Sequence, residues 1–245
     1  MSKHILKFTV LDPVVLVLTG LAAGLIIYHV ISIPLSRGGV STAIGFVPEI
    51  KRQFLWELTV VPDFIDRTSR IIGGSFLVLG AVTAVFGAYV VGASRDFGYS
   101  SLANLMGVGR RRYLRFSILT PIIVYLLVPS LASAIIIPPL VDYNLLEYWQ
   151  VPVALALITM TILAVQLAIS ILLTHVAANT YRGLILTLIA VYAIGMARLQ
   201  DKLIVISREM ESLNELLMRI AGVAVIAIIV LAIAYMIVER RTTTR

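Results

Sequence analysis

Long apolar blocks alternate with short polar segments along this chain, and the apolar blocks have the length of membrane spans. A span needs about 20 mainly apolar residues to cross about 30 Å of hydrocarbon. Five blocks meet this length: residues 14–35, 71–91, 116–140, 151–176 and 220–238. A sixth block, 183–197, lies between Arg182 and Arg198. As a helix it would reach only about 22 Å, so we expect this span to be thinned or broken. The pattern predicts an all-α integral membrane protein, with six transmembrane helices in a single transmembrane domain over residues 1–245.

Composition supports the same class. Of the 245 residues, 60% are hydrophobic and only 13% are charged, whereas about a quarter are charged in an ordinary soluble domain. The first apolar block lacks a small-residue cleavage site and is too long for a signal-peptide core, so we expect a retained span. We therefore expect a multi-pass protein of the cell membrane, with the lipid bilayer as its surroundings.

The formal net charge of +7 is unevenly distributed. Six spans would put both termini and the loop between the second and third spans on one side. The segments on that side hold 11 basic and 3 acidic residues, and the remaining segments hold 9 and 10. Because loops rich in Lys and Arg stay in the cytoplasm, this asymmetry predicts cytoplasmic N and C termini. It explains the positive charge without a nucleic-acid partner.

Small residues recur at helical spacing in two of the predicted spans. Gly20 and Gly24 form a GxxxG pair in the first, and Gly80, Ala84 and Ala88 form a stripe in the second. Such residues let another helix approach closely. We expect them to serve helix packing, although glycine is also common in membrane helices without that role.

The fourth span carries a polar stripe. Thr159, Gln166, Ser170 and Thr174 follow one another at spacings of 7, 4 and 4, which places them on one helix face. The stripe could line a substrate path, or it could hold helices together through hydrogen bonds between them. The sequence leaves both interpretations open.

A second amphipathic segment precedes the last span. Apolar residues recur at spacings of 4 and 3 over residues 199–217, with charged residues between them, which is typical of a helix. This segment could be a helical extension outside the membrane, an interfacial helix or two short re-entrant pieces.

Several kinds of chemistry are missing from the sequence. There is no phosphate-binding G-x-x-x-x-G-K-[ST] loop, no G-x-S-x-G motif and no cysteine. The five full-length spans contain no charged residue, and such residues are the usual markers of ion or proton pathways. We therefore expect neither an enzyme nor a metal or cofactor site on this chain.

The basic segment between the second and third spans is the one specialised feature that is left. This hinge segment, residues 95–115, reads RDFGYSSLANLMGVGRRRYLR. A helix over residues 96–108 would place Asp96 at its N-terminal end and arginines at its C-terminal end, as the helix dipole favours. From charge alone, it could equally be an interfacial helix whose arginines hold phospholipid head groups.

The hinge segment resembles a motif of ATP-binding-cassette permeases of type 2. That family typically carries R-E-x-G-T, then seven residues, then P-V-S-R, between its second and third spans. Without any gap, matching residues of this chain are Arg95, Gly98, Val108 and Arg110, with Asp96 at the glutamate position. The departures are Tyr99 for threonine, Gly107 for proline and Gly109 for serine. The six spans, the internal termini and the amphipathic segment before the last span also resemble this family in outline.

This resemblance implies the permease subunit of a transporter of the exporting kind, with a coupling helix that inserts into a separate cytoplasmic ATPase. ATP and Mg²⁺ would be bound by that partner, and two permease chains, identical or different, would form the substrate path. The residues implied in ATPase coupling are Arg95, Asp96, Gly98, Leu102, Leu105, Val108, Arg110, Arg111 and Arg112.

Two alternatives remain. Residues 107–121 also resemble the cytoplasmic loop of cassette importer permeases, although Thr120 before Pro121 shifts the spacing by one. A non-transporting anchor or scaffold subunit of a respiratory or secretion complex would need no catalytic residue at all. The apolar spans weakly favour a lipid-like or amphipathic cargo over an ion.

Overall fold

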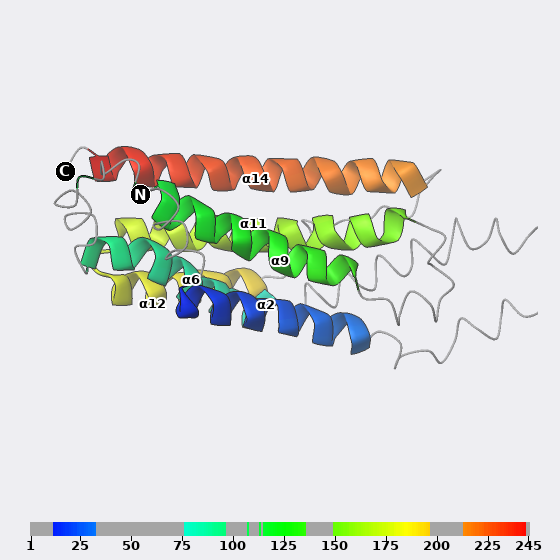
Figure 1. Ribbon diagram of the computed structural model, residues 1–245, viewed down its shortest axis with the longest axis horizontal. Helices are drawn as coiled ribbons and strands as arrows, with labels where there is room; N and C mark the ends of the chain where they lie inside the picture. Colours follow the sequence, from blue (N-terminus) through cyan, green and yellow to red (C-terminus); the bar gives the residue numbers. More distant parts are fainter. Residues whose placement is uncertain are drawn as a thin grey trace, which may run out of the picture.

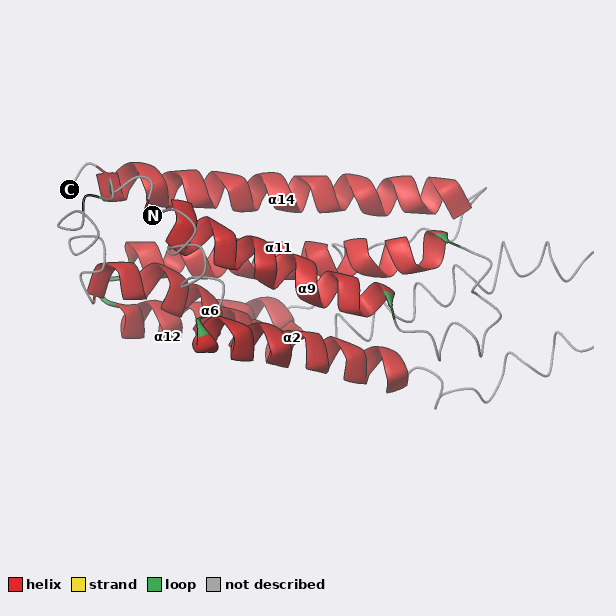
Figure 2. Cartoon of the chain, in the orientation of Figure 1, coloured by secondary structure: helices red, strands yellow, loops and turns green. Residues whose placement is uncertain are grey.

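The computed structural model describes residues 12–32, 76–96, 107, 113, 115–135, 149–196 and 213–243. All the regular structure within these residues is helical (Figure 2). The helices are α2 Pro13–Ser32, α6 Phe76–Asp96, the π-helix η3 Arg115–Leu119, α9 Thr120–Ala134, α11 Gln150–Val176, α12 Thr180–Met196 and α14 Leu213–Thr243. The predicted all-helical fold is confirmed for this part of the chain.

Within the described residues, three helical stretches are long and apolar enough to cross a membrane: Arg115–Ala134, Gln150–Val176 and Asn214–Arg240, with 20, 27 and 27 residues. Three shorter apolar stretches are Pro13–Tyr28, Leu77–Gly92 and Thr180–Ile194. Each of the six apolar blocks overlaps one of these stretches. The structure thus supports a membrane protein, while the six-span topology and its orientation stay predictions.

The helix ends differ from the predicted span ends. α6 continues to Asp96, so Arg95 and Asp96 belong to this helix and not to a separate hinge helix. α12 begins at Thr180 and includes Arg182, which the sequence pattern placed outside the span. α9 ends at Ala134, and residues 136–140 of the predicted third span lie outside the described residues.

α14 begins well before the last apolar block and runs for 31 residues without interruption. Residues 213–218 form a helical extension that continues into α14, while its place outside the membrane stays a prediction. Glu215 and Arg219 form an ion pair of 2.6 Å on this extension, one helical turn apart. Residues 199–212 lie outside the described part of the chain.

The third helical stretch begins with a wide turn. η3 is one π-helical turn that leads directly into α9, whose second residue is Pro121. Pro121 lacks the backbone N–H that would continue the hydrogen bonds of this stretch, so the change from π-helix to α-helix falls beside a residue that cannot donate. Pro129 lies inside α9, where it removes one backbone hydrogen bond.

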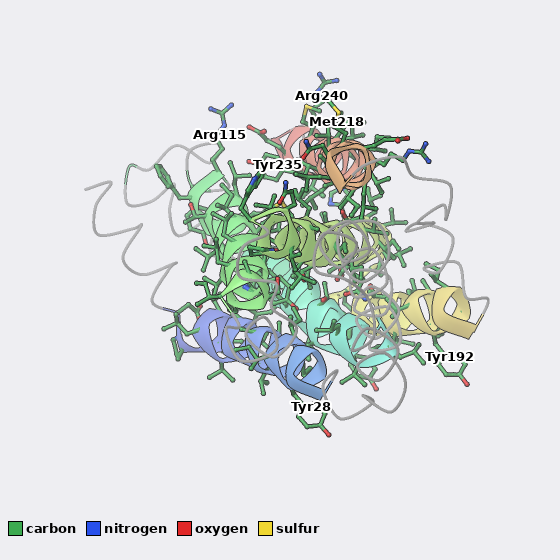
Figure 3. The ribbon with its side chains drawn as sticks, turned by 90° about the vertical axis from the view of Figure 1, so that its right-hand side faces the viewer. Tyr28, Arg115, Tyr192, Met218, Tyr235 and Arg240 are labelled. Carbon is green, nitrogen blue, oxygen red and sulfur yellow. The ribbon has the colours of Figure 1, made fainter. Side chains whose placement is uncertain are left out.

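α11 is the central helix of the bundle. It packs against α14, α6, α9 and α12, while α2 lies outside and touches α9 and α6 (Figures 1 and 3). Its residues Leu155, Ile158, Leu163 and Leu167 are buried among these neighbours. Tyr28, Tyr192 and Met218 project outward from α2, α12 and α14 in the end-on view of Figure 3. Most exposed side chains on the perimeter are large and apolar, as expected for a surface that faces lipid.

Close helix contacts depend on glycines. A Cβ added to Gly87 of α6 would lie 2.7 Å from the Cβ of Ser170 on α11, and one added to Gly80 would overlap Val191 of α12. At the connection between α11 and α12, a Cβ on Gly183 would lie 2.6 Å from the Cα of Thr174. Real Cβ atoms do not approach others this closely, so these helices touch only because the side chains are absent.

We predict that Gly183→Ala destabilises the fold by about 1–3 kcal/mol, the usual cost of overpacking. The added methyl would meet a backbone atom of Thr174, which no side-chain rotation can remove. The measurement is the temperature at which the detergent-solubilised protein leaves the monodisperse peak in size-exclusion chromatography.

Gly222→Ala is the matched control, because a Cβ at this helical position meets nothing within 4 Å. It should keep or slightly raise the transition temperature, since alanine favours the helix. Equal transition temperatures for the two variants would contradict the close approach at Gly183.

Candidate functional site

Little of the hinge segment falls within the described residues. Gly98, Leu102, Leu105, Val108, Arg110, Arg111 and Arg112 lie outside them. Gly107 is described: it is exposed, sits in a turn and has a φ of 73°. A right-handed helix cannot continue through such a residue, whereas glycine often ends a helix in this conformation. The predicted helix over residues 96–108 therefore does not continue through Gly107.

Asp96 does not have the role that the sequence pattern gave it. It is the last residue of α6, and its carboxylate turns to the N-terminus of α12 instead of starting a hinge helix. The backbone N–H of Thr180 donates to Asp96 Oδ2 at 2.8 Å, and the Thr180 hydroxyl donates to the same oxygen. A carboxylate is favourable at the start of a helix, which explains this orientation.

Two further polar contacts join helices at the same end of the bundle. The Tyr89 hydroxyl of α6 donates to Asp12 Oδ2 at 2.7 Å, while Asp12 Oδ1 accepts from the N–H of Val14 at the start of α2. Arg115 Nε of η3 lies 3.1 Å from Glu239 Oε1 of α14. We call this end, where α6 ends and η3 begins, the hinge end of the bundle; it lies on the left of Figure 1.

Polar side chains also meet inside the bundle, and we call Thr83, Tyr125 and Gln166 the buried polar cluster. Thr83 Oγ1 of α6 lies 2.9 Å from the Tyr125 hydroxyl of α9 and 3.1 Å from Gln166 Oε1 of α11. The Thr83 hydroxyl has a single proton to donate. Gln166 Oε1 and the Leu79 carbonyl oxygen can only accept hydrogen bonds, so that proton points toward them. Tyr125 is therefore the donor to Thr83. Phe86 stacks on the Tyr125 ring, with centroids 4.1 Å apart.

The structure buries the whole polar stripe of the fourth predicted span. Gln166 belongs to the buried polar cluster, and Ser170 Oγ donates to the Ala84 carbonyl of α6 at 3.3 Å. Thr174 is covered by the Gly183 region, and the hydroxyl of Thr159 has no hydrogen-bond partner among the described residues. Gln166 and Ser170 thus make bonds between helices, and a path along this stripe would require α6 to move away from α11.

The predicted packing residues fall into two groups. Gly80, Ala84 and Ala88 are buried between α6 and its neighbours. Gly20 and Gly24 are exposed, and a Cβ at either position would meet nothing within 4 Å. Within the described residues, the GxxxG pair of α2 therefore faces away from the rest of the bundle.

Sequence reasoning missed several residues of these contacts. Thr83, Tyr125 and Thr180 lie on helices other than the one that carries the polar stripe, so spacing along one helix could not reveal them. Gly87 and Gly92 had a usable signal. Gly87 follows Gly80 by seven residues, which is two helical turns and the same face.

Comparisons of this chain with protein-family models, curated proteins and solved structures gave no match. Among the described residues, no group of three or more histidine or carboxylate side chains is placed to hold a metal ion.

We predict that Thr83→Val and Tyr125→Phe each destabilise the protein by about 1 kcal/mol. Both substitutions keep the side-chain shape and remove one hydroxyl of the buried polar cluster. Because the hydroxyls are partners, the double variant should lose less than the sum, by about 0.6 kcal/mol, a typical coupling between membrane helices. The measurement is reversible unfolding of the protein in mixed micelles with a denaturing detergent.

Tyr192→Phe removes the hydroxyl of an exposed tyrosine and should leave stability unchanged. Strict additivity of Thr83→Val and Tyr125→Phe would show that their hydroxyls do not interact.

Proposed function

We propose that this protein is the membrane permease subunit of an ATP-binding-cassette transporter of type 2, acting as an exporter and driven by a separate ATPase chain. The observation that carries the proposal is the match of the hinge segment to the family motif without a gap. Arg95, Gly98, Val108 and Arg110 are identical to the motif, and Asp96 keeps the charge of its glutamate. The absence of a phosphate-binding loop in the sequence fits a division of labour between two chains.

The geometry of the hinge end supports this proposal. The hinge segment connects α6 to η3, and polar contacts join these two helices to α2, α12 and α14 at that end. A partner that pushes on the hinge segment would therefore act on helices that are linked to most of the bundle.

The exposed glycines of α2 are suited to contact with the second permease chain that the proposal requires. Gly20 and Gly24 lie on a surface that also exposes Leu16, Val17 and Leu21. The described surface is mostly apolar, and the buried Thr83, Tyr125, Gln166 and Ser170 are already bonded between helices. These features favour an apolar or amphipathic cargo that moves beside lipid over a hydrated ion.

We predict that a cytoplasmic ATPase with a phosphate-binding loop co-purifies with the chain in mild detergent at a one-to-one ratio. Reversing two charges of the hinge segment, Arg110→Glu with Arg112→Glu, should lower the amount of bound ATPase by about tenfold, because interfacial charges are lost and replaced by opposite ones. The measurement is quantitative mass spectrometry of the purified complex.

The matched control is Arg241→Glu with Arg245→Glu, which makes the same change of net charge in the C-terminal tail. ATPase binding should persist in this variant. Recovery of redox subunits and no ATPase would instead favour the membrane-anchor interpretation and contradict the proposal.

A further inference from the structure

We propose that Asp96 and Thr180 form a clasp that makes α6 and α12 move together, so that displacement at the end of α6 reaches α12. This inference rests on the proposed function, because the displacement would come from the ATPase through the hinge segment. It assigns Asp96 to coupling within the chain, whereas the family resemblance implies contact with the ATPase.

The first observation is that Asp96 of α6 caps the N-terminus of α12. Four N–H groups at the start of a helix lack partners within that helix. In α12, the N–H of Thr180 is bonded by Asp96 of a different helix, and the N–H of Arg182 is bonded by the neighbouring Asn179 Oδ1 at 2.8 Å. One of the two caps is therefore local, and the other is available only while α6 stays in place.

The second observation is the fit of Thr180 against α6 one turn before Asp96. A Cβ added to Gly92 would lie 2.7 Å from the Cβ of Thr180 and would overlap its Oγ1 and Cγ2 atoms. The Thr180 side chain thus occupies the space that a side chain at position 92 would need. Thr180 is held between the backbone at Gly92 and the carboxylate of Asp96, which opposes sliding in either direction.

The third observation is a second contact far from the clasp. Gly80 of α6 lies against Val191 of α12, about 18 Å along the helix from Gly92 at 1.5 Å per residue. Two contacts at this separation fix both the distance and the tilt between the helices. On the outer side of α12, Ile185, Ile189 and Tyr192 are exposed. Within the described residues, this side makes no comparable contact with another helix.

The test is hydrogen exchange of the full complex with its co-purified ATPase in lipid nanodiscs, with and without trapping by Mg-ATP and vanadate. In the wild type, trapping should change exchange in the last turn of α6, residues 92–96, and in the first turn of α12, residues 180–184. In Asp96→Ala, the change in α6 should persist, while the change in α12 should fall at least twofold. Without nucleotide, the first turn of α12 should exchange about threefold faster or more in this variant, because a cap is lost.

Thr180→Ser is the matched control, because it keeps the hydroxyl and the backbone N–H and should transmit the change as the wild type does. Thr180→Val keeps the shape, loses the hydroxyl and should give an intermediate change. Equal vanadate-dependent exchange of α12 in Asp96→Ala and wild type would overturn the clasp as a coupling element, even if basal exchange rose.

The two proposals fail in different ways. If Asp96→Ala loses the ATPase itself, as the hinge variant is expected to, Asp96 is a contact for the partner and the clasp is rejected. If no ATPase accompanies even the wild type, the proposed function fails, and the coupling role of the clasp fails with it. Basal exchange of α12 would still show whether Asp96 caps this helix.

Discussion

The close approach of α6 to α11 and α12 is the contact on which the rest of the structure depends. Lipid chains are as apolar as leucine, so helices in a bilayer gain little from burying leucine against each other and associate through packing and hydrogen bonds. Gly87, which lies against Ser170 of α11, and Gly80 and Gly92, which lie against α12, allow α6 to come close enough for both. Once α6 lies against α11, Thr83 can reach Gln166, and Ser170 can reach the Ala84 carbonyl. A bulkier α6 would lose packing and polar bonds at the same time.

The polar contacts divide by position in a way that solvation explains. Inside the bundle they are neutral: a tyrosine, a threonine, a serine and a glutamine. At the hinge end they use the carboxylates of Asp12, Asp96 and Glu239. A carboxylate in the bundle interior would carry a large desolvation cost, whereas at a helix end it keeps part of its hydration and meets free N–H groups. The interior contacts therefore join helices without placing a charge in the apolar interior, and the contacts that use a charge lie at the hinge end.

The sequence predicted the features that depend on the local pattern of residues. It did not predict the features that depend on contacts between residues far apart in the chain. Apolar length predicted six helical segments, because the need to avoid water acts on each block by itself. The ends of α6 and α12 were missed, because the residue that caps Thr180 lies 84 positions earlier in the chain. The polar stripe was found from its spacing, but its two interpretations could be compared only when Thr83 appeared on the opposite helix. For the GxxxG pair of α2, the spacing identifies a surface suited to close helix contact, but it does not identify the helix that covers this surface.

Asp96 and Gly92 together determine how closely α6 approaches Thr180 at the start of α12. The related family motif has glutamate where this chain has aspartate, and a glutamate carboxylate reaches one methylene farther from its backbone. A shorter acid can cap α12 only if the first turn of α12 lies nearer to α6. That turn can lie nearer because position 92 has no side chain, and Thr180 fills the space. The substitution that departs from the motif is thus matched by a glycine one turn away. The aspartate therefore fits a close junction between α6 and α12.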